Sequence, residues 1–554
     1  MDEPPPSNSD SASTYSIQSL LQLLKDSIWK KRPILGEIMK KHGHKTLFNY
    51  AMEFADVNPT PQFDDRKTEL IKTATDLISK RLGVEIAVDA MRQLKRLPLV
   101  STADHHGPID HPFWVNANII TSLFHLDNPK HIMQYLVVFS FASISMNNAS
   151  AFPRGLLFHS EPNGAGKLIR LPLLPDKLKM GVVYNSRGII KSDIDNAVNQ
   201  LDKLTKSNEI NPEIAKKVKE LMEEYVNVEE ILELPDLNTQ ITRLNFRLWH
   251  DTFHKTGGLP TDRHNKMLDL IYLDIETLTK ELLVKFHLNN NQSLIYRLLF
   301  NPDFIKLAKT HFNNIPGAFS IEEDWGTWFF WGLDEKMRRV RLFTDGQKLY
   351  SPDKSISINF EPSSLIEALE KKVIYPSMMT CYLIVALYYG MKCLGGFCQV
   401  HDLTMLKYAW FKMLNKLGFK EEAEAILPIQ TKELGGDGMV LSYCKRPDNK
   451  FVPATGIDML LDDSDTSPNQ YVELSRRVSL NDIMNPMLPE IYTVLYPFDK
   501  RDPKLANLTP EDILEATGLG EKIIQKTEVR VHPTSKISVK ISKPESHQSH
   551  AKTI

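Results

Sequence analysis

The sequence predicts an α+β protein that is predominantly helical, with a small sheet in its N-terminal half. Long segments repeat apolar residues at helical spacing, as between Ile17 and Ile28. Short, continuously apolar segments within residues 97–185 are typical of buried strands instead. Aromatic and turn residues near 327–350 predict a second, short antiparallel meander, with a first hairpin formed by Thr327–Leu333 and Arg338–Phe343.

The first 96 residues predict a disordered leader followed by helices. Residues 1–14 are rich in Pro, Ser and Asp, and we expect them to be disordered. Helical periodicity then runs from Tyr15 to Arg96, and Asn58-Pro-Thr-Pro divides these helices into two sets. The same helices are expected to pack on the small sheet, so that residues 15–190 form one region.

The sheet of that region begins with a short apolar run, Leu97 to Val100, and continues with Tyr135–Ser145. Between these two strands we expect an amphipathic helix over about Phe113 to Leu126. Two further strands, Leu156–His159 and Leu168–Leu174, predict a hairpin because Asn163-Gly164 between them is a strong turn signal.

The remainder of the chain predicts mainly helices. Residues 191–290 are expected to form a charged helical region, whose last helices run near Leu237–His254 and Arg263–His287. Residues 291–526 form a mixed, mainly helical C-terminal region, and residues 527–554 a disordered polar tail.

Composition narrows the possible functions. The 554 residues are 42% hydrophobic and 25% charged, as in soluble globular proteins, and the net charge of -2 gives no basic field for nucleic acid. Val373–Met391 is uncharged but contains Pro376 and several tyrosines, which favour a buried helix over a membrane span. Four cysteines fit a reducing compartment. We therefore expect a cytoplasmic protein with neither a membrane nor a nucleic-acid partner, and its oligomeric state stays open.

The densest group of reactive residues follows the first expected strand. Asp104, His105, His106, Asp110 and His111 lie within eight positions, with Gly107 and Pro108 turning the chain between them. Imidazole and carboxylate are ligands of Zn²⁺, Mn²⁺ and Fe²⁺. Because adjacent side chains diverge in extended backbone, we expect a divalent metal to take Asp104 or His106 together with Asp110 or His111, completed from elsewhere.

The same loop offers candidates for acid–base catalysis. His105, His106 and Asp110 are the predicted catalytic residues, since a histidine beside a carboxylate titrates near neutrality and can accept a proton. Asn147, Asn148 and Arg154 follow the second expected strand. If the two strands are neighbours, these three residues lie at the same end of the sheet, and Arg154 could bind the carboxylate or phosphate of a substrate.

Three families carry motifs that these residues resemble. Asp104-His105-His106 after a strand resembles the DHH phosphoesterases, which implies that these residues hold Mn²⁺. His105-His106-Gly-Pro-Ile-Asp110 is similar to the His-His-x-x-x-Asp-Gly motif of CoA-dependent acyltransferases and condensation domains, which implies that His106 is a general base. His105-x4-Asp110 resembles the glycerolipid acyltransferases, in which a His base is paired with an Asp. The resemblances imply different reactions, and the sequence leaves the choice open.

The sequence favours an enzyme that acts on a small polar or anionic substrate, by metal-assisted hydrolysis of an ester, amide or phosphoester. One alternative is metal-free acyl transfer with His106 as the base, and another is a non-enzymatic helical scaffold for interactions. No nucleotide is expected. Pro162-Asn-Gly-Ala-Gly-Lys167 resembles a P-loop, but Glu161 replaces its first glycine and Leu168 its Ser or Thr.

Overall fold

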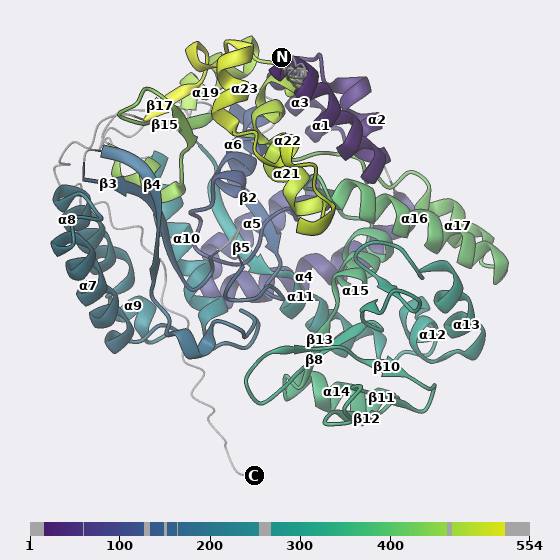
Figure 1. The fold of residues 1–554 in the computed structure, drawn as a ribbon. Coiled ribbons are helices and arrows are strands. Elements are labelled where there is room, and N and C mark those ends of the chain that lie inside the picture. Colours follow the sequence, from purple (N-terminus) through teal and green to yellow (C-terminus); the bar gives the residue numbers. More distant parts are fainter. Residues whose placement is uncertain are drawn as a thin grey trace, which may run out of the picture.

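A four-stranded parallel sheet lies inside a mostly helical α+β protein, and the predicted fold class is confirmed (Figure 1). The computed structural model describes residues 16–58, 60–126, 133–148, 152–162, 164–253, 267–462 and 468–526. The strand order is β14-β1-β2-β5. The strands are β1 (Leu99–Ser101), β2 (Tyr135–Ser140), β5 (Asp269–Asp274) and β14 (Lys392–Leu394).

Two of these strands were predicted and two were not. β1 and β2 match the expected strands and are parallel neighbours, with Ser101 opposite Val138. β5 and β14 come from outside residues 97–185. The expected helix over Arg263–His287 lies outside the described residues before Met267 and is wrong in part after it, because Asp269–Asp274 form β5 and α11 (Ile275–Leu282) starts only afterwards. Periodicity cannot distinguish the short apolar run within β5 from a buried helix, and pairing with β2 makes it a strand.

The two faces of this sheet belong to two apolar cores, because successive side chains of a strand point to opposite faces. Val138 and Tyr272 lie in the first core, while Val137 and Ile271 lie in the second. Helices α6 (Pro112–Leu126) and α10 (Leu237–Phe253) contribute to the first core. Helices that contribute to the second core include α4 (Asp64–Leu82), α5 (Val84–Arg96) and α11.

Helix α6 corrects one expectation. Its position is as predicted, but every residue from Phe113 to Leu126 is buried, so the helix is not amphipathic. The reason is that α6 also packs on the C-terminal part of the chain, where the Asn116 side chain accepts a hydrogen bond from the Leu441 amide and Thr121 donates one to the Gly435 carbonyl. A helix that is covered on both sides has no face exposed to solvent, and its sequence need not place polar residues on one face.

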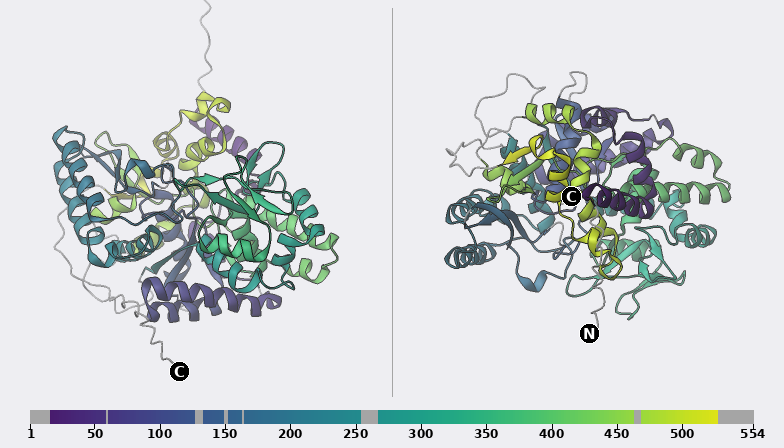
Figure 2. Two further views of the ribbon diagram at one scale, coloured as in Figure 1. Left: turned by 90° about the horizontal axis from the view of Figure 1, so that it is seen from below. Right: turned by 45° about the horizontal axis from the view of Figure 1, so that its top comes forward.

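The N-terminal helices pack against C-terminal ones. Periodicity predicted helices between Tyr15 and Arg96, and this is confirmed by α1 (Ile17–Lys31), α2 (Pro33–His42), α3 (Leu47–Met52), α4 and α5. α1 contacts α21 and α3 contacts α19. In the right-hand view of Figure 2, the purple N-terminal helices lie beside the yellow C-terminal segments. These C-terminal helices are α19 (Pro468–Arg477), α20 (Leu480–Met484), α21 (Leu488–Leu495), α22 (Pro503–Ala506) and α23 (Pro510–Thr517). Residues 1–14 and 527–554 lie outside the described residues.

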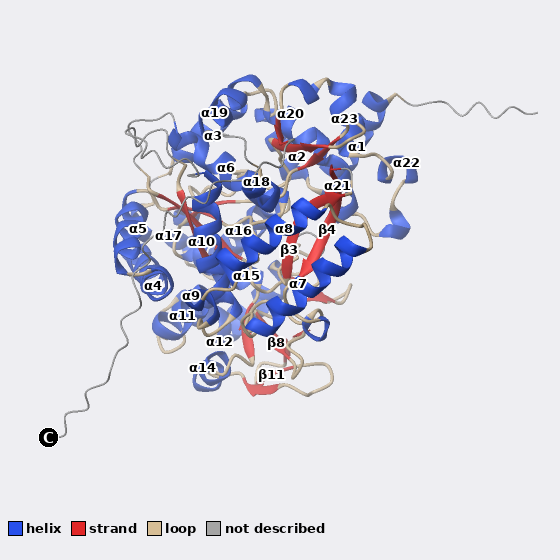
Figure 3. Cartoon of the chain, turned by 90° about the vertical axis from the view of Figure 1, so that its left-hand side faces the viewer, coloured by secondary structure: helices blue, strands red, loops and turns tan. Residues whose placement is uncertain are grey.

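A separate two-stranded ribbon follows β2. The predicted hairpin is confirmed as β3 (Gly155–Glu161) and β4 (Gly164–Pro172), which are antiparallel to each other but do not join the parallel sheet. Figure 3 shows the ribbon next to the charged helices, of which α7 contacts β4. These helices are α7 (Lys191–Lys206), α8 (Pro212–Leu221) and α9 (Glu229–Leu232).

The predicted meander near 327–350 is divided between two small sheets. β8 (Phe330–Leu333) and β9 (Arg339–Val340) pair antiparallel and take β13 (Ile374–Pro376) as third strand. β10 (Phe343–Thr344) and β11 (Lys348–Tyr350) pair with each other and with β12 (Ser357–Asn359). A short pair, β6 (Phe319–Ser320) and β7 (Trp325–Gly326), precedes them.

The helices of this part are α12 (Leu294–Phe300), α13 (Pro302–His311), α14 (Pro362–Glu370), α15 (Met378–Tyr382), α16 (Gln399–Lys416) and α17 (Lys420–Ile426). The uncharged segment Val373–Met391 forms β13, α15 and the π-helical turn Leu383–Tyr388 that continues it. None of the helices in the described ranges has the length and apolar character needed to cross a membrane.

The last sheet has the order β16-β15-β17, and the helices of the C-terminal part lie in sequence between β16 and β17. Its strands are β15 (Ser442–Lys445), β16 (Phe451–Pro453) and β17 (Ile524–Lys526). Directly after β16 comes α18 (Gly456–Leu461), which contacts both β3 and α10. This contact brings the C-terminal third of the chain to the β3–β4 ribbon.

Candidate functional site

The 104–111 loop leaves the carboxyl end of β1, the edge at which parallel sheets commonly bind ligands. Its first residues continue the pairing with the chain after β2: the Phe141 amide donates to the Asp104 carbonyl (2.9 Å), and the His106 amide donates to the Phe141 carbonyl (2.8 Å). The strand neighbourhood that the sequence analysis assumed therefore holds.

His106 is fully buried, and both of its ring nitrogens are bonded within the protein. Nε2 lies 3.0 Å from the Asn238 carbonyl, to which it donates, so Nδ1 accepts from the Ser140 hydroxyl at 2.8 Å. Burial lowers the pKa of His106 to about 4, which keeps the ring neutral. A general base for acyl transfer needs a ring nitrogen open to substrate, whereas His106 ties the loop to β2 and α10.

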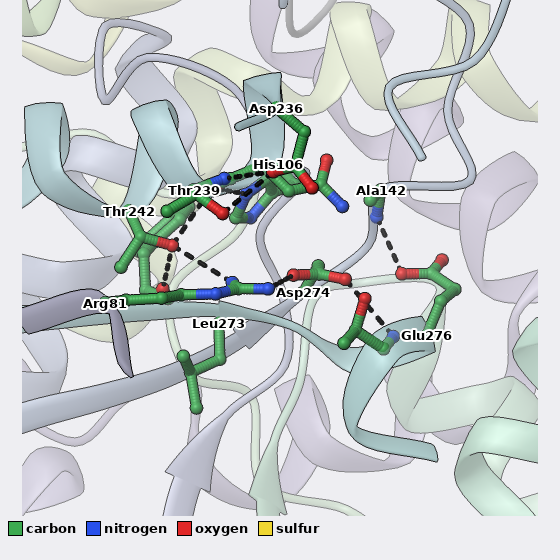
Figure 4. A network of polar contacts seen from close by, with 12 residues as sticks. Arg81, His106, Ala142, Asp236, Thr239, Thr242, Leu273, Asp274 and Glu276 are labelled. Carbon is green, nitrogen blue, oxygen red and sulfur yellow. Dashed lines mark hydrogen bonds and ion pairs between the residues drawn. The ribbon is translucent and has the colours of Figure 1, made fainter. Parts of the chain in front are cut away.

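A buried ionic network surrounds His106, as Figure 4 shows. Arg81 of α4 pairs with Asp274 at the end of β5 (Nη2–Oδ1 2.6 Å) and donates to the Thr242 hydroxyl (3.1 Å). Burial alone would raise the pKa of Asp274, but the charge of Arg81, joined in acid by that of protonated His106, outweighs it and holds that pKa well below its usual range. Asp274 is therefore ionised and paired.

Glu276 lies at the same sheet edge and is also buried. Its two oxygens accept the backbone amides of Ala142 and Ser143, each at 2.9 Å, as the right-hand side of Figure 4 shows for Ala142. Burial raises the pKa of Glu276 to about 7. The carboxyl group thus holds the chain that follows β2.

Asp104, the first residue of the loop, has a buried side chain, and one of its carboxylate oxygens accepts two hydrogen bonds. The side-chain amide of Asn118 (2.8 Å) and the Tyr272 hydroxyl both donate to Oδ2. Oδ1 has no hydrogen-bond partner in the described part of the chain. Burial raises the pKa of Asp104 to about 7, against the opposing effect of its two donors.

The rings of His105 and His111 both lie against the indole of Trp114. Their ring centroids are 4.9 Å and 4.7 Å from that of Trp114. Burial lowers the pKa of His105 to about 4 and that of His111 to about 3. The Phe113 amide also donates to Nδ1 of His111 (3.3 Å), so this ring caps the start of α6.

Asp110 faces away from the sheet, toward the β3–β4 ribbon. Its Oδ2 accepts from the Leu157 amide (3.0 Å), and its backbone carbonyl accepts from the Gly456 amide (2.8 Å). The loop therefore contributes to several contacts in different directions. In the described ranges, Asp104, His106, Asp110 and His111 do not form a group of three ligand atoms within 4.8 Å of one another.

The three predicted substrate-binding residues lie in the connection between β2 and β3. Arg154 pairs with Asp176 (2.6 Å), and its guanidinium lies 5.6 Å from the Phe152 ring centroid. Asn147 is exposed in a turn, where its backbone amide donates to Ser145 Oγ, and Asn148 is half-buried. Their role in binding a substrate stays a prediction.

A different set of residues could hold a metal ion. Within the described ranges, His159, Cys444 and Asp458 each place one ligand atom within 4.8 Å of the others. They come from β3, from the central strand β15 of the C-terminal sheet and from α18. His159 and Cys444 are buried, and Asp458 is partly exposed.

Hydrogen bonds fix the His159–Asp458 pair within this group. Asp458 Oδ1 accepts from the His159 amide (2.8 Å), and Oδ2 lies 2.7 Å from His159 Nδ1. Oδ2 also accepts from the Thr455 amide (2.8 Å), in the capping box that starts α18. Burial alone would raise the pKa of Asp458, but the charge and hydrogen bonds of His159 outweigh it and lower that pKa.

The sequence carries no local signal for this group, because its members are far apart in the chain. His159 lies in an expected strand, and Cys444 is an isolated cysteine. The available signal, Thr455-x-x-Asp458, indicates a helix start and not a ligand. No protein-family model and no curated protein sequence matches this chain.

Proposed function

We propose that this protein binds a divalent metal ion of the zinc type at His159, Cys444 and Asp458 and uses it to hydrolyse a small polar or anionic substrate. The observation that supports this proposal is the convergence of three ligand atoms within 4.8 Å from three separate elements. A structural histidine needs one carboxylate partner, but it does not need a thiol as well.

The donor set favours zinc over harder metals. A thiolate is a soft ligand, imidazole is intermediate and carboxylate is hard, a mixture that Zn²⁺ accepts and that Mn²⁺ or Mg²⁺ rarely takes. Three protein ligands are also the number found in catalytic zinc sites, where the fourth position is left to water or substrate. Bound zinc lowers the pKa of its water to near neutrality, which supplies the nucleophile for hydrolysis.

In the metal-free protein, the Nδ1 proton of His159 joins the ring to Asp458 Oδ2 and holds both side chains in one orientation. A metal ion that takes Nδ1 and Oδ2 as ligands would displace this proton, because ligands must be deprotonated to bind a metal. The lowered pKa of Asp458 keeps this carboxylate ionised at neutral pH. Both effects prepare the imidazole to bind a cation or to accept a proton.

Calorimetric titration of chelator-treated protein with Zn²⁺ tests the metal site. We expect one ion per chain for the wild type and a loss of at least about 100-fold in affinity for Cys444→Ser. Cys393→Ser is the matched control, because Cys393 is equally buried but lies outside the group. Absence of binding by the wild type, or equal binding by Cys444→Ser, would overturn the metal site.

Hydrolysis is tested separately with a panel of ester, amide and phosphoester substrates. We expect turnover that a chelator abolishes and Zn²⁺ restores, and that Cys393→Ser retains. A protein that binds zinc but hydrolyses none of these bonds would contradict the catalytic part of the proposal and leave a structural ion.

A second function is favoured by the 2.7 Å contact between His159 and Asp458. Cysteine, histidine and carboxylate also form the nucleophile, base and orienting group of thiol enzymes. In that case metal-free protein reacts with iodoacetamide at Cys444: the thiol proton passes to His159, a carbon–sulfur bond forms and iodide leaves. The reaction should slow in His159→Ala, and a zinc site without thiol activation would show no such dependence.

A further inference from the structure

We propose that Asp110 is the positioning residue of the His159–Cys444–Asp458 group, because it fixes β3 and α18, which carry two of the three residues, against each other. This role rests on the proposed metal site. It also gives the 104–111 loop a function different from that of a binding site.

The first contact is along the edge of β3. The Leu157 amide donates to Asp110 Oδ2 (3.0 Å), and two residues later the His159 amide donates to Asp458 Oδ1 (2.8 Å). Residues two apart in a strand share one side, and the other edge of β3 pairs with β4. On this edge of β3, the carboxyl groups of Asp110 and Asp458 thus accept the backbone hydrogen bonds that a neighbouring strand would otherwise accept.

The second contact is with the start of α18. The Asp110 carbonyl accepts from the Gly456 amide (2.8 Å), two residues before Asp458. The approach is so close that a Cβ on Gly456 would lie 2.0 Å from the Ile109 carbonyl oxygen. Only glycine allows the loop backbone to lie directly on this helix end. Asp110 therefore holds β3 through its side chain and α18 through its backbone.

The loop that carries Asp110 is itself anchored. The Ile109 amide donates to the side chain of Asn245 (2.9 Å), and the same side chain donates to the Gly107 carbonyl (2.8 Å). Asn245 belongs to α10 and is fully buried. Asn245 therefore fixes the loop on α10. Through Asp110, the loop in turn fixes β3, which carries His159, and α18, which carries Asp458.

The charge state of Asp110 suggests how to test it. Burial raises the pKa of Asp110 well above its usual value, and the neighbouring Asp458 raises it further. The Leu157 amide needs only an acceptor oxygen, and an amide side chain of the same shape also offers one. Asp110→Asn keeps the acceptor for Leu157, whereas Asp110→Ala removes it.

Zinc affinity measured by competition with a chelator tests the proposal. We expect Asp110→Ala to bind about tenfold or more weakly than wild type and Asp110→Asn to stay within about threefold. Asp110→Val, which fills the volume without an acceptor, serves if the alanine variant does not fold. Asp104→Ala is the control, since Asp104 is equally buried in the same loop but bonds to Asn118 and Tyr272.

A second readout separates this proposal from the metal site. In metal-free protein with nitrogen-15-labelled histidine, the His159 Nδ1–H signal reports the bond to Asp458. We expect Asp110→Ala or Asp110→Val to lose this signal and Asp110→Asn to keep it. Wild-type affinity and an unchanged signal in the alanine or valine variant would overturn the role of Asp110. A wild type that binds no zinc would overturn the metal site, while the signal still decides the role of Asp110.

Discussion

The 104–111 loop and the His159–Cys444–Asp458 group are opposites in sequence and in space. The loop collects five ionisable residues in eight positions, yet its side chains bond to β2, α10, α6 and β3 separately, and its backbone bonds to α18. The group is scattered over three distant segments, yet its ligand atoms converge within 4.8 Å. Density along the chain therefore marked a structural junction, and convergence in space marks the candidate site.

The difference has a physical cause. A loop at the carboxyl edge of a parallel sheet is buried by the surrounding helices, and each buried polar group needs a partner. His106, Asp104 and Asp110 obtain partners from different elements, so the loop joins those elements. The two regions make opposite predictions for mutation: the loop residues other than Asp110 should affect stability, and the group should affect metal binding.

The largest expected loss of stability comes from breaking the Arg81–Asp274 pair at the loop's sheet edge. Arg81→Met leaves Asp274 buried without its counter-charge, and we expect a loss of about 3–5 kcal/mol in the free energy of unfolding. Arg92→Met breaks the exposed pair with Asp89 and should cost less than about 1 kcal/mol. Denaturant titration measures both variants. Similar losses for the two would contradict the structural role of the sheet edge.

His106→Ala should separate the two regions most clearly. It removes the bonds to Ser140 and Asn238 and leaves a cavity, so we expect a loss of about 2–4 kcal/mol with unchanged zinc affinity. His159→Ala should show the reverse, a strong loss of zinc affinity with a smaller loss of stability in metal-free protein. Weakened zinc binding by His106→Ala would break the comparison.

Acid should destabilise the loop through His106. Its pKa falls from the ordinary 6.5 to about 4 on folding, so the neutral ring contributes stability that is present above pH 6.5 and is lost as the pH falls toward 4. By linkage, this one group accounts for about 2 kcal/mol between pH 8 and 4.5. Denaturant titrations across this range should show a shallower acid limb for His106→Gln than for wild type. An equally steep fall of the unfolding free energy in acid for the two proteins would mean that His106 is not held neutral.

The smallest expected effect concerns the metal-free group. Asp458→Asn weakens the bond to His159 and should cost about 1 kcal/mol at neutral pH. Because folding lowers the pKa of Asp458, the ionised carboxylate contributes stability above its unfolded pKa and loses it as the pH falls. The difference between wild type and variant should therefore shrink in acid, as thermal unfolding at several pH values would show. A difference that grows in acid would contradict the ionised pair.

Local pattern predicted much of the fold. The N-terminal helices, β1, β2 and the β3–β4 hairpin follow from periodicity and from the Asn163-Gly164 turn. β5 was missed because a short apolar run fits a strand or a helix, and only its pairing with β2 decides. α6 was expected to be amphipathic because the C-terminal segment that covers its second side lies far away in the sequence.

The candidate site could not be predicted in the same way. His159, Cys444 and Asp458 meet because α18 packs on β3 and because β15 lies near β4. Both contacts join segments with no local sequence signal for each other. The loop at 104–111 had the stronger local signal, and its residues serve the contacts that bring those segments together.

X-ray absorption at the zinc edge of the zinc-loaded protein tests the metal site most directly. We predict one sulfur neighbour at about 2.3 Å and nitrogen or oxygen neighbours at about 2.0–2.1 Å, with the sulfur lost in Cys444→Ser and kept in Cys393→Ser. A spectrum with only nitrogen and oxygen neighbours in the wild type, or a sulfur that persists in Cys444→Ser, would contradict the assignment of this group as the metal centre.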